Sequence, residues 1–199
     1  RAAIPHPRRM AAALERRMEL LPTLYTLFHE AATTGLPVAR PMFFADPSDP
    51  ELRALDDQFL LGDALLVAPV VHAGETSREV VLPRGSDWYA FPSGGERLAP
   101  GRIQVAAALG HTPVFARAGS IVVTRASALS ARASSRLAPV LHVMLDRDGR
   151  ARGHLYEDDG EQRVRSASEA RLTRFEARLA AGRVQVEAES EGDYQAVVR

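Results

Sequence analysis

Asp56 and Asp57 are the adjacent acids whose type and spacing come nearest to catalytic chemistry in this sequence. Two carboxyl groups can share acid–base work on a glycosidic bond when they flank it, about 5–5.5 Å apart for retention of configuration or 6.5–9.5 Å for inversion. Adjacent residues of an extended strand point to opposite faces, so these two cannot both face one substrate. We therefore expect a structural role, an ion pair with an arginine such as Arg40.

The acidic segment Asp158-Asp159-Gly160 could imitate part of a calcium-binding loop. An EF-hand loop places oxygen ligands at alternate positions over twelve residues and ends in Glu. Here Glu161 follows at once, so the spacing fails. Asp and Gly are also the residues that tight turns favour. We predict a turn at this position, and another at residues 146–149 for the same reason.

Other catalytic and metal-binding patterns are missing from the sequence. It contains no Cys, which excludes disulfides and thiolate chemistry. There is no Gly-x-Ser-x-Gly nucleophile motif and no Gly-rich phosphate loop. The histidines are scattered, with no pair at zinc-ligand spacing. We therefore expect no catalytic residue, no metal site and no cofactor in this chain; the six histidines are His6, His29, His72, His111, His142 and His154.

Three aromatic residues lie close together at Trp88, Tyr89 and Phe91. Such a group could form a platform on which a sugar ring stacks. Alternation along a strand puts Trp88 on one face and the other two on the opposite face. Aromatic residues are favoured in strands for their packing alone. Packing within a sheet is therefore the preferred interpretation, and a sugar platform is the alternative.

The overall composition excludes some classes of partner. The 199 residues carry 25 acidic and 25 basic side chains, and all the basic ones are Arg. This neutral balance gives no reason to expect a nucleic acid or an anionic membrane as partner. No apolar run approaches the ~18 residues of a transmembrane helix.

A long amphipathic helix is predicted from about Arg8 to Thr34. Pro22 should kink or split it, because proline lacks the N–H group and crowds the carbonyl four residues earlier. Gly35 followed by Pro37 should end it. The apolar stripe is broad enough to require a packing partner, which we expect upstream of Arg1; its residues are Met10, Leu14, Met18, Leu21, Tyr25 and Phe28.

The segment from Leu55 to Val71 marks the transition from helix to β-structure. Its two apolar runs are joined at Gly62-Asp63, a pair that suits a tight turn. Short apolar segments bounded by turn residues then recur about every ten residues, which is typical of an antiparallel sandwich. We predict a mainly β fold preceded by one long helix; the expected strands cover 38–44, 79–82, 88–91, 102–106, 112–124, 140–145, 153–156, 171–179 and 183–189, with a loose connection at 126–138.

Five blocks, in the same order, resemble glycoside hydrolase family 31, the α-glucosidase and α-xylosidase family. They are Leu20-Leu21-Pro22-Thr23-Leu24-Tyr25 with its continuation to Phe28, and then residues 35–43, 56–70, 113–121 and 155–161. Thr23 stands where the family usually has an aromatic residue, and Met18 where it often has Tyr. From the first to the last, the blocks extend over residues 20–161, which is most of the chain.

The resemblance is to the C-terminal portion of that family and implies three parts. Residues 1–36 would hold the last helix of a catalytic (β/α)₈ barrel, 37–128 a proximal β-sandwich and 138–199 a truncated distal β-domain. The family's Asp nucleophile, Asp acid and active-site His lie upstream. No residue here, including His6, takes over a catalytic role.

The function implied is that of a C-terminal β-sandwich fragment of a retaining α-glycoside hydrolase, most closely an α-glucosidase. It would be inactive alone. Its expected partners are the missing barrel, packed on the first helix, and through that barrel an α-glucoside or related oligosaccharide. The alternative is a non-catalytic carbohydrate-binding or scaffold module.

Overall fold

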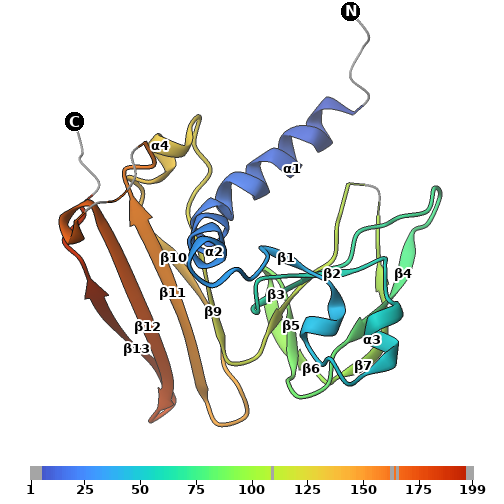
Figure 1. Cartoon of the computed structure of the whole chain (residues 1–199). Coiled ribbons are helices and arrows are strands. Elements are labelled where there is room, and N and C mark those ends of the chain that lie inside the picture. The colour runs from blue at the N-terminus through green and yellow to red at the C-terminus, as the bar shows by residue number, and fades with distance from the viewer. Residues whose placement is uncertain (1–5, 109, 162–163, 165, 196–199) are drawn as a thin grey trace, which may run out of the picture.

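The computed structural model describes residues 6–108, 110–161, 164 and 166–195 (Figure 1). Its N-terminal helical part is divided as predicted, into α1 (Pro7–Glu19) and α2 (Leu21–Thr34). The break falls at Leu20, because Pro22 tolerates only the first turn of a helix. Gly35 ends α2 in the left-handed conformation, φ 78°, and its N–H donates to the carbonyl of Ala31.

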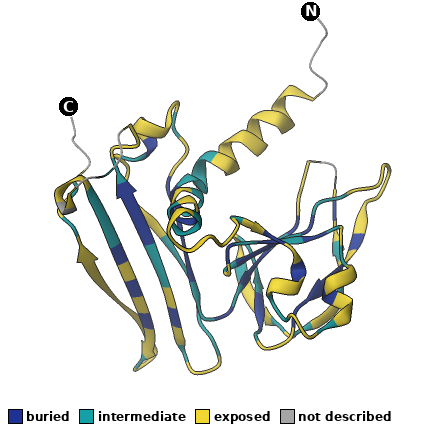
Figure 2. Ribbon diagram, viewed as in Figure 1, coloured by how far each residue is buried: buried dark blue, intermediate teal, exposed yellow. Residues whose placement is uncertain are grey.

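The two helices differ in how they are packed. None of the residues of α1 is buried, and α1 projects away from the β-structure (Figures 1 and 2). The side chains of Met10 and Leu14 on this helix are 49% and 59% exposed. In contrast, α2 lies against both sheets and buries Pro22, Thr26 and Leu27.

The first β-rich part of the chain consists of a six-stranded sheet and a separate two-stranded ladder. The order in the larger sheet is β1-β2-β3-β8-β5-β6; the ladder pairs β4 with β7. The bounds are β1 Ala39–Arg40, β2 Phe59–Leu61, β3 Leu65–Val67, β4 Ser77–Leu82, β5 Trp88–Ala90, β6 Gly94–Leu98, β7 Gly101–Ala106 and β8 Val114–Arg117. Their apolar faces form one core, in which Leu66, Val80 and Trp88 are fully buried.

The segment before β2 is less extended than predicted. The expected strand 38–44 is only β1, because Pro41 cannot donate to a ladder, and the 3₁₀-helix η1 (Met42–Phe44) follows. A short helix, α3 (Pro50–Ala54), comes next, and its N-cap Asp49 accepts from the N–H of Glu51 at 2.9 Å.

The predicted hairpin at Gly62-Asp63 is confirmed. β2 pairs antiparallel with β3 in the register Leu61↔Leu65, and Gly62 has φ 59°. A β-carbon on Gly62 would lie 2.5 Å from Cδ2 of Leu27, so glycine also lets α2 approach the turn closely. The hairpin thus joins the helix to the first sheet.

The second sheet has the order β10-β9-β11-β12-β13. It is antiparallel except for one parallel bridge between β11 and β9, at Arg152 and Ser120. The bounds are β9 Ser120–Thr124, β10 Val140–Met144, β11 Arg150–Asp158, β12 Ala170–Ala180 and β13 Arg183–Glu191, with the short helices α4 Ala131–Ser134 and η2 Ala167–Glu169 between strands.

The single strand predicted at 112–124 is divided in two. Gly119, at φ 86°, breaks it into β8 and β9, which belong to different sheets. The loose connection at 126–138 contains α4, and β6 was not predicted. The mainly β, antiparallel fold class with a preceding helical segment is confirmed.

Candidate functional site

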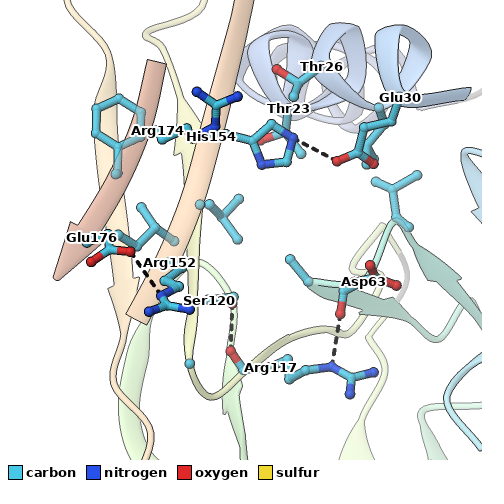
Figure 3. A pocket seen from close by; sticks show the side chains of 18 of the residues that line it. Thr23, Thr26, Glu30, Asp63, Arg117, Ser120, Arg152, His154, Arg174 and Glu176 are labelled. Atoms are coloured by element: carbon cyan, nitrogen blue, oxygen red, sulfur yellow. Dashed lines mark hydrogen bonds and ion pairs between the residues drawn. The ribbon is translucent and has the colours of Figure 1, made fainter. Parts of the chain in front are cut away.

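A cavity of about 570 Å³ lies where α2, the β2–β3 turn, the β8–β9 segment, β11 and β12 meet (Figure 3). The helix contributes Thr23, Thr26, Leu27 and Glu30, spaced by three or four residues and therefore on one face. Segments that are more than a hundred residues apart in the chain thus line the same cavity. The fold positions the cavity by packing α2 across both sheets.

Two hydroxyl groups fix α2 on the second sheet. Thr23 donates to the carbonyl of Val123 on β9 at 2.7 Å. Thr26 donates to the carbonyl of Pro22 and accepts from the N–H of Tyr156 on β11 at 3.0 Å. Thr23 is the position where the resemblance leads one to expect an aromatic residue, and here its hydroxyl satisfies a strand carbonyl instead.

Glu30 is the centre of an ion-pair chain along the cavity wall. One carboxylate oxygen lies 2.7 Å from Nε2 of His154, and the other lies 3.6 Å from Nη2 of Arg40. The Arg40 side chain is 3% exposed and also forms an ion pair with Asp63. Its Nε donates to the carbonyl of Pro37 at 2.9 Å. Figure 3 shows His154 and Glu30 pointing toward one another beside α2.

Arg117 enters the cavity from β8. Its Nε donates to the backbone carbonyl of Asp63 at 2.9 Å, and its guanidinium carbon lies 5.1 Å from the ring centroid of Trp88. Burial lowers the pKa of Arg117, while the charge of Asp63 acts in the opposite direction. On the far side of the cavity, Arg152 forms an exposed ion pair with Glu176 at 3.2 Å.

The predicted contact of Arg40 with Asp56 or Asp57 is wrong. Asp57 instead forms an ion pair with the buried Arg78 at 2.9 Å, and Asp56 is exposed. Arg40 stands opposite Leu60 in the sheet, so it lies near the end of the β2–β3 hairpin, where it binds Asp63. The structural role predicted for the acid pair holds for Asp57, but with a different arginine.

The aromatic residues pack within the β-structure, as the preferred interpretation predicted. Trp88 is 0% exposed, and its indole N–H donates to the carbonyl of Pro83 at 3.1 Å. The Tyr89 hydroxyl donates to the carbonyl of Leu145 at 2.7 Å, and the ring of Phe91 meets His142 edge-on. Burial raises the pKa of Tyr89. These rings therefore do not form a sugar platform.

Both predicted acidic turns are confirmed. Asp158 accepts from the N–H of Gly160 at 2.8 Å and from the hydroxyl of Tyr25, whose pKa is raised by burial and then by that hydrogen bond. Asp146 accepts from the N–H of Asp148 at 2.9 Å. In the part of the chain that the structure describes, no cluster of three His, Asp or Glu residues suits a metal ion.

Sequence reasoning did not bring together the polar residues of the cavity, among them Glu30, Asp63, Arg117 and His154. They come from α2, the β2–β3 turn, β8 and β11, and no local motif unites them. The helical spacing of Thr23, Leu27 and Glu30 is a signal in the sequence, but it also fits a solvated helix face. Only the packing of α2 across the two sheets brings the four side chains together.

The fold combines a six-stranded and a five-stranded β-sheet with a helical N-terminal segment. No described helix is long and apolar enough to cross a membrane. Each cavity carboxylate is held by an ion pair, with His154, Arg40 or Arg152 as partners. These paired side chains place hydrogen-bond donors and acceptors on the wall of the cavity.

Residues 35–122 match the Glycosyl hydrolase family 31 C-terminal domain. The chain is 40% identical to an alpha-glucosidase of Aspergillus oryzae over 155 residues, and 39% identical to the neutral alpha-glucosidase AB of Homo sapiens over 150 residues. These alignments cover 75% and 74% of this chain. The chain therefore belongs to glycoside hydrolase family 31, as a C-terminal portion.

Solved structures agree with this assignment over nearly the whole chain. The GH31 dextranase of Flavobacterium johnsoniae superimposes with a TM-score of 0.86 at 28% identity, covering 97% of this chain and 24% of that one. The GH31 alpha-xylosidase of Xanthomonas citri gives 0.84 at 32% identity, covering 98% and 21%. The chain spans about 16% of the length of the two curated relatives.

Proposed function

We propose that this chain is the C-terminal β-domain part of a retaining α-glycoside hydrolase, most closely an α-glucosidase, and that it is inactive by itself. The observation that carries the proposal is the 40% identity to an alpha-glucosidase over three quarters of the chain. In the complete enzyme, an Asp nucleophile and an Asp acid–base outside these residues would cleave the glycosidic bond. The present residues would support the domain that carries them.

We propose the same three-part organisation that the resemblance implies. Residues 1–36 supply a helix of the catalytic barrel, 37–128 a proximal β-domain and 138–199 a distal β-domain. The pairing of β9 with β10 supports a close connection between the two β-domains, because Ser120–Thr124 lies before the second boundary and yet belongs to the second sheet. The strand β9 thus lies within residues 37–128 but belongs to the sheet of the distal β-domain.

The exposed apolar face of the helices is the proposed contact with the barrel. Met10 and Leu14 of α1 and Phe28 of α2 are 49%, 59% and 62% exposed, and Tyr25 lies between them on the predicted stripe. Apolar side chains gathered in this way mark an interaction surface. The relatives are several times longer than this chain, so the barrel is the partner that their length supports.

An activity assay tests the proposed role. The 199-residue chain alone should not hydrolyse an aryl α-glucoside, whereas a protein in which it follows a family 31 barrel should. Turnover by the isolated chain would contradict the proposal. To test the contact, Leu14→Asp and Phe28→Asp should each reduce co-purification with a separately expressed barrel, and Glu15→Ser on α1 should not.

A further inference from the structure

The cavity between α2 and the two sheets has balanced charge. Glu30 and Asp63 are both bound by Arg40, and Glu176 is bound by Arg152. Arg117 adds a donor beside Asp63, and His154 lies beside Glu30. With both signs of charge interspersed, the walls set up no strong field of one sign that would attract a small anion or a metal cation.

The mouth of the cavity places an acceptor and a donor beside one another. Asp63 has one carboxylate oxygen on Arg40, and its side chain is 82% exposed, so the other oxygen faces solvent. Arg117 uses Nε on the carbonyl of Asp63, and the described residues give its two Nη groups no hydrogen-bond partner. Two neighbouring hydroxyl groups, each able to donate and accept, match such a pair.

The rest of the cavity has the size and surface of a ligand site. Its volume of about 570 Å³ lies within the usual range of roughly 300–1,000 Å³ for small-molecule pockets. Leu27, Leu61, Ala64 and Phe175 supply apolar walls, against which the C–H face of a sugar ring can pack. His154 offers its second ring nitrogen in the same space.

We propose that this cavity binds a short neutral oligosaccharide, with vicinal hydroxyl groups held by Asp63 and Arg117 and the ring faces packed on Leu61 and Phe175. The cavity lies on the face of α2 that carries Thr23, Leu27 and Glu30. Tyr25 and Phe28, the proposed barrel contact, lie on another face of that helix. A saccharide in the cavity and a barrel on the helix are therefore compatible, and neither proposal requires the other.

The experiment is a titration of the ¹⁵N-labelled 199-residue chain with maltotriose, followed by amide NMR shifts. We expect shifts at Asp63, Ala64, Ser120 and His154 that saturate at one dissociation constant. Asp63→Asn keeps the shape of the turn but replaces the charged acceptor, and it should weaken binding about tenfold. Asp148→Asn, an exposed turn carboxylate away from the cavity, is the matched control and should bind like the wild type.

The amide spectrum also reports whether each variant is folded. If Asp63→Asn disturbs the fold, Arg117→Gln replaces it as the test and should weaken binding by a similar factor. Maltotriose without effect on the cavity amides would overturn the proposal. Inorganic phosphate that shifts these amides where maltotriose does not would also overturn it, because the cavity would then be an anion site.

Discussion

Replacing Glu157 by Gln should destabilise this protein more than the loss of any exposed ion pair. The carboxylate of Glu157 on β11 accepts from Nη2 of Arg125 at 2.5 Å and from Nη2 of Arg171 at 2.6 Å. The side chains of Glu157 and Arg125 are each 7% exposed, whereas that of Arg171 is 33% exposed. The substitution keeps the shape but leaves Arg125 charged, buried and without its counterion.

The size of the effect follows from that burial. Removing one partner of a buried ion pair costs about 3–5 kcal/mol, because the remaining charge keeps its desolvation penalty. Other hydrogen bonds do not compensate the charge of Arg125, because its Nε already lacks a hydrogen-bond partner among the described residues. For a protein of this size, that cost corresponds to a decrease in Tm of roughly 6–20 °C.

The pKa of Glu157 gives the effect a pH dependence. Burial alone would raise this pKa, but hydrogen bonds from Arg171 and Arg125 outweigh it, so the pKa lies below the ordinary value. A carboxyl whose folded pKa is depressed stabilises the fold above its unfolded pKa of about 4.3, and this contribution is lost as the pH falls through the folded value. The wild-type advantage over Glu157→Gln should therefore shrink only in acid.

The assay is urea unfolding followed by circular dichroism, at neutral pH and at several acidic pH values. Glu187→Gln is the matched control, because Glu187 forms a 2.6 Å ion pair with Arg178 in which both side chains are more than half exposed. The control should change the free energy of unfolding by about 1 kcal/mol at most. A Glu157→Gln variant as stable as this control would refute the reasoning.

Three further predictions concern packing. Gly153→Ala should lower the free energy of unfolding in urea by about 1–3 kcal/mol. The new β-carbon would lie 2.8 Å from Cβ of Ile121 and closer still to the carbonyl oxygen of Ile121. Unchanged stability would contradict the close approach of β11 to β9. Trp88, the single tryptophan, should emit at short wavelength and resist acrylamide quenching because it is 0% exposed. Tyr89→Phe should cost about 0.5–1.5 kcal/mol, since the carbonyl of Leu145 loses its donor, and a neutral result would argue against that bond.

The sequence predicted the elements whose pattern is local. The Gly62-Asp63 hairpin followed from turn chemistry, and the division of the helix followed from Pro22. Gly119 is also a local signal, for a break in the strand. The apolar residues on both sides of it nevertheless favoured one continuous strand, so the change of sheet between β8 and β9 was not predicted. Five ordered blocks predicted the family, which turn and strand patterns alone could not identify.

The ion pairs could not be predicted in the same way. An arginine side chain is long, so Arg40 can reach acids from several elements, and its actual partners, Glu30 and Asp63, lie 10 residues before it and 23 residues after it. Which acid it binds depends on how α2 crosses the hairpin. The cavity has the same origin, because its polar residues meet only after the helix and the two sheets are packed together.

That packing makes α2 a link between the two sheets. One helix face binds β9 through Thr23, β11 through Thr26 and the hairpin through Leu27. On the same face, Glu30 pairs with Arg40 on β1 and with His154 on β11. Besides the helix, the two sheets are joined by the short β8–β9 connection, by a shared buried cluster of Leu65, Ala116, Val122 and Met144, and by side-chain contacts such as that of Tyr89. Because the other face of α2 carries the exposed Tyr25 and Phe28, a partner docked there would fix the orientation of both sheets through one helix, and the walls of the cavity with them.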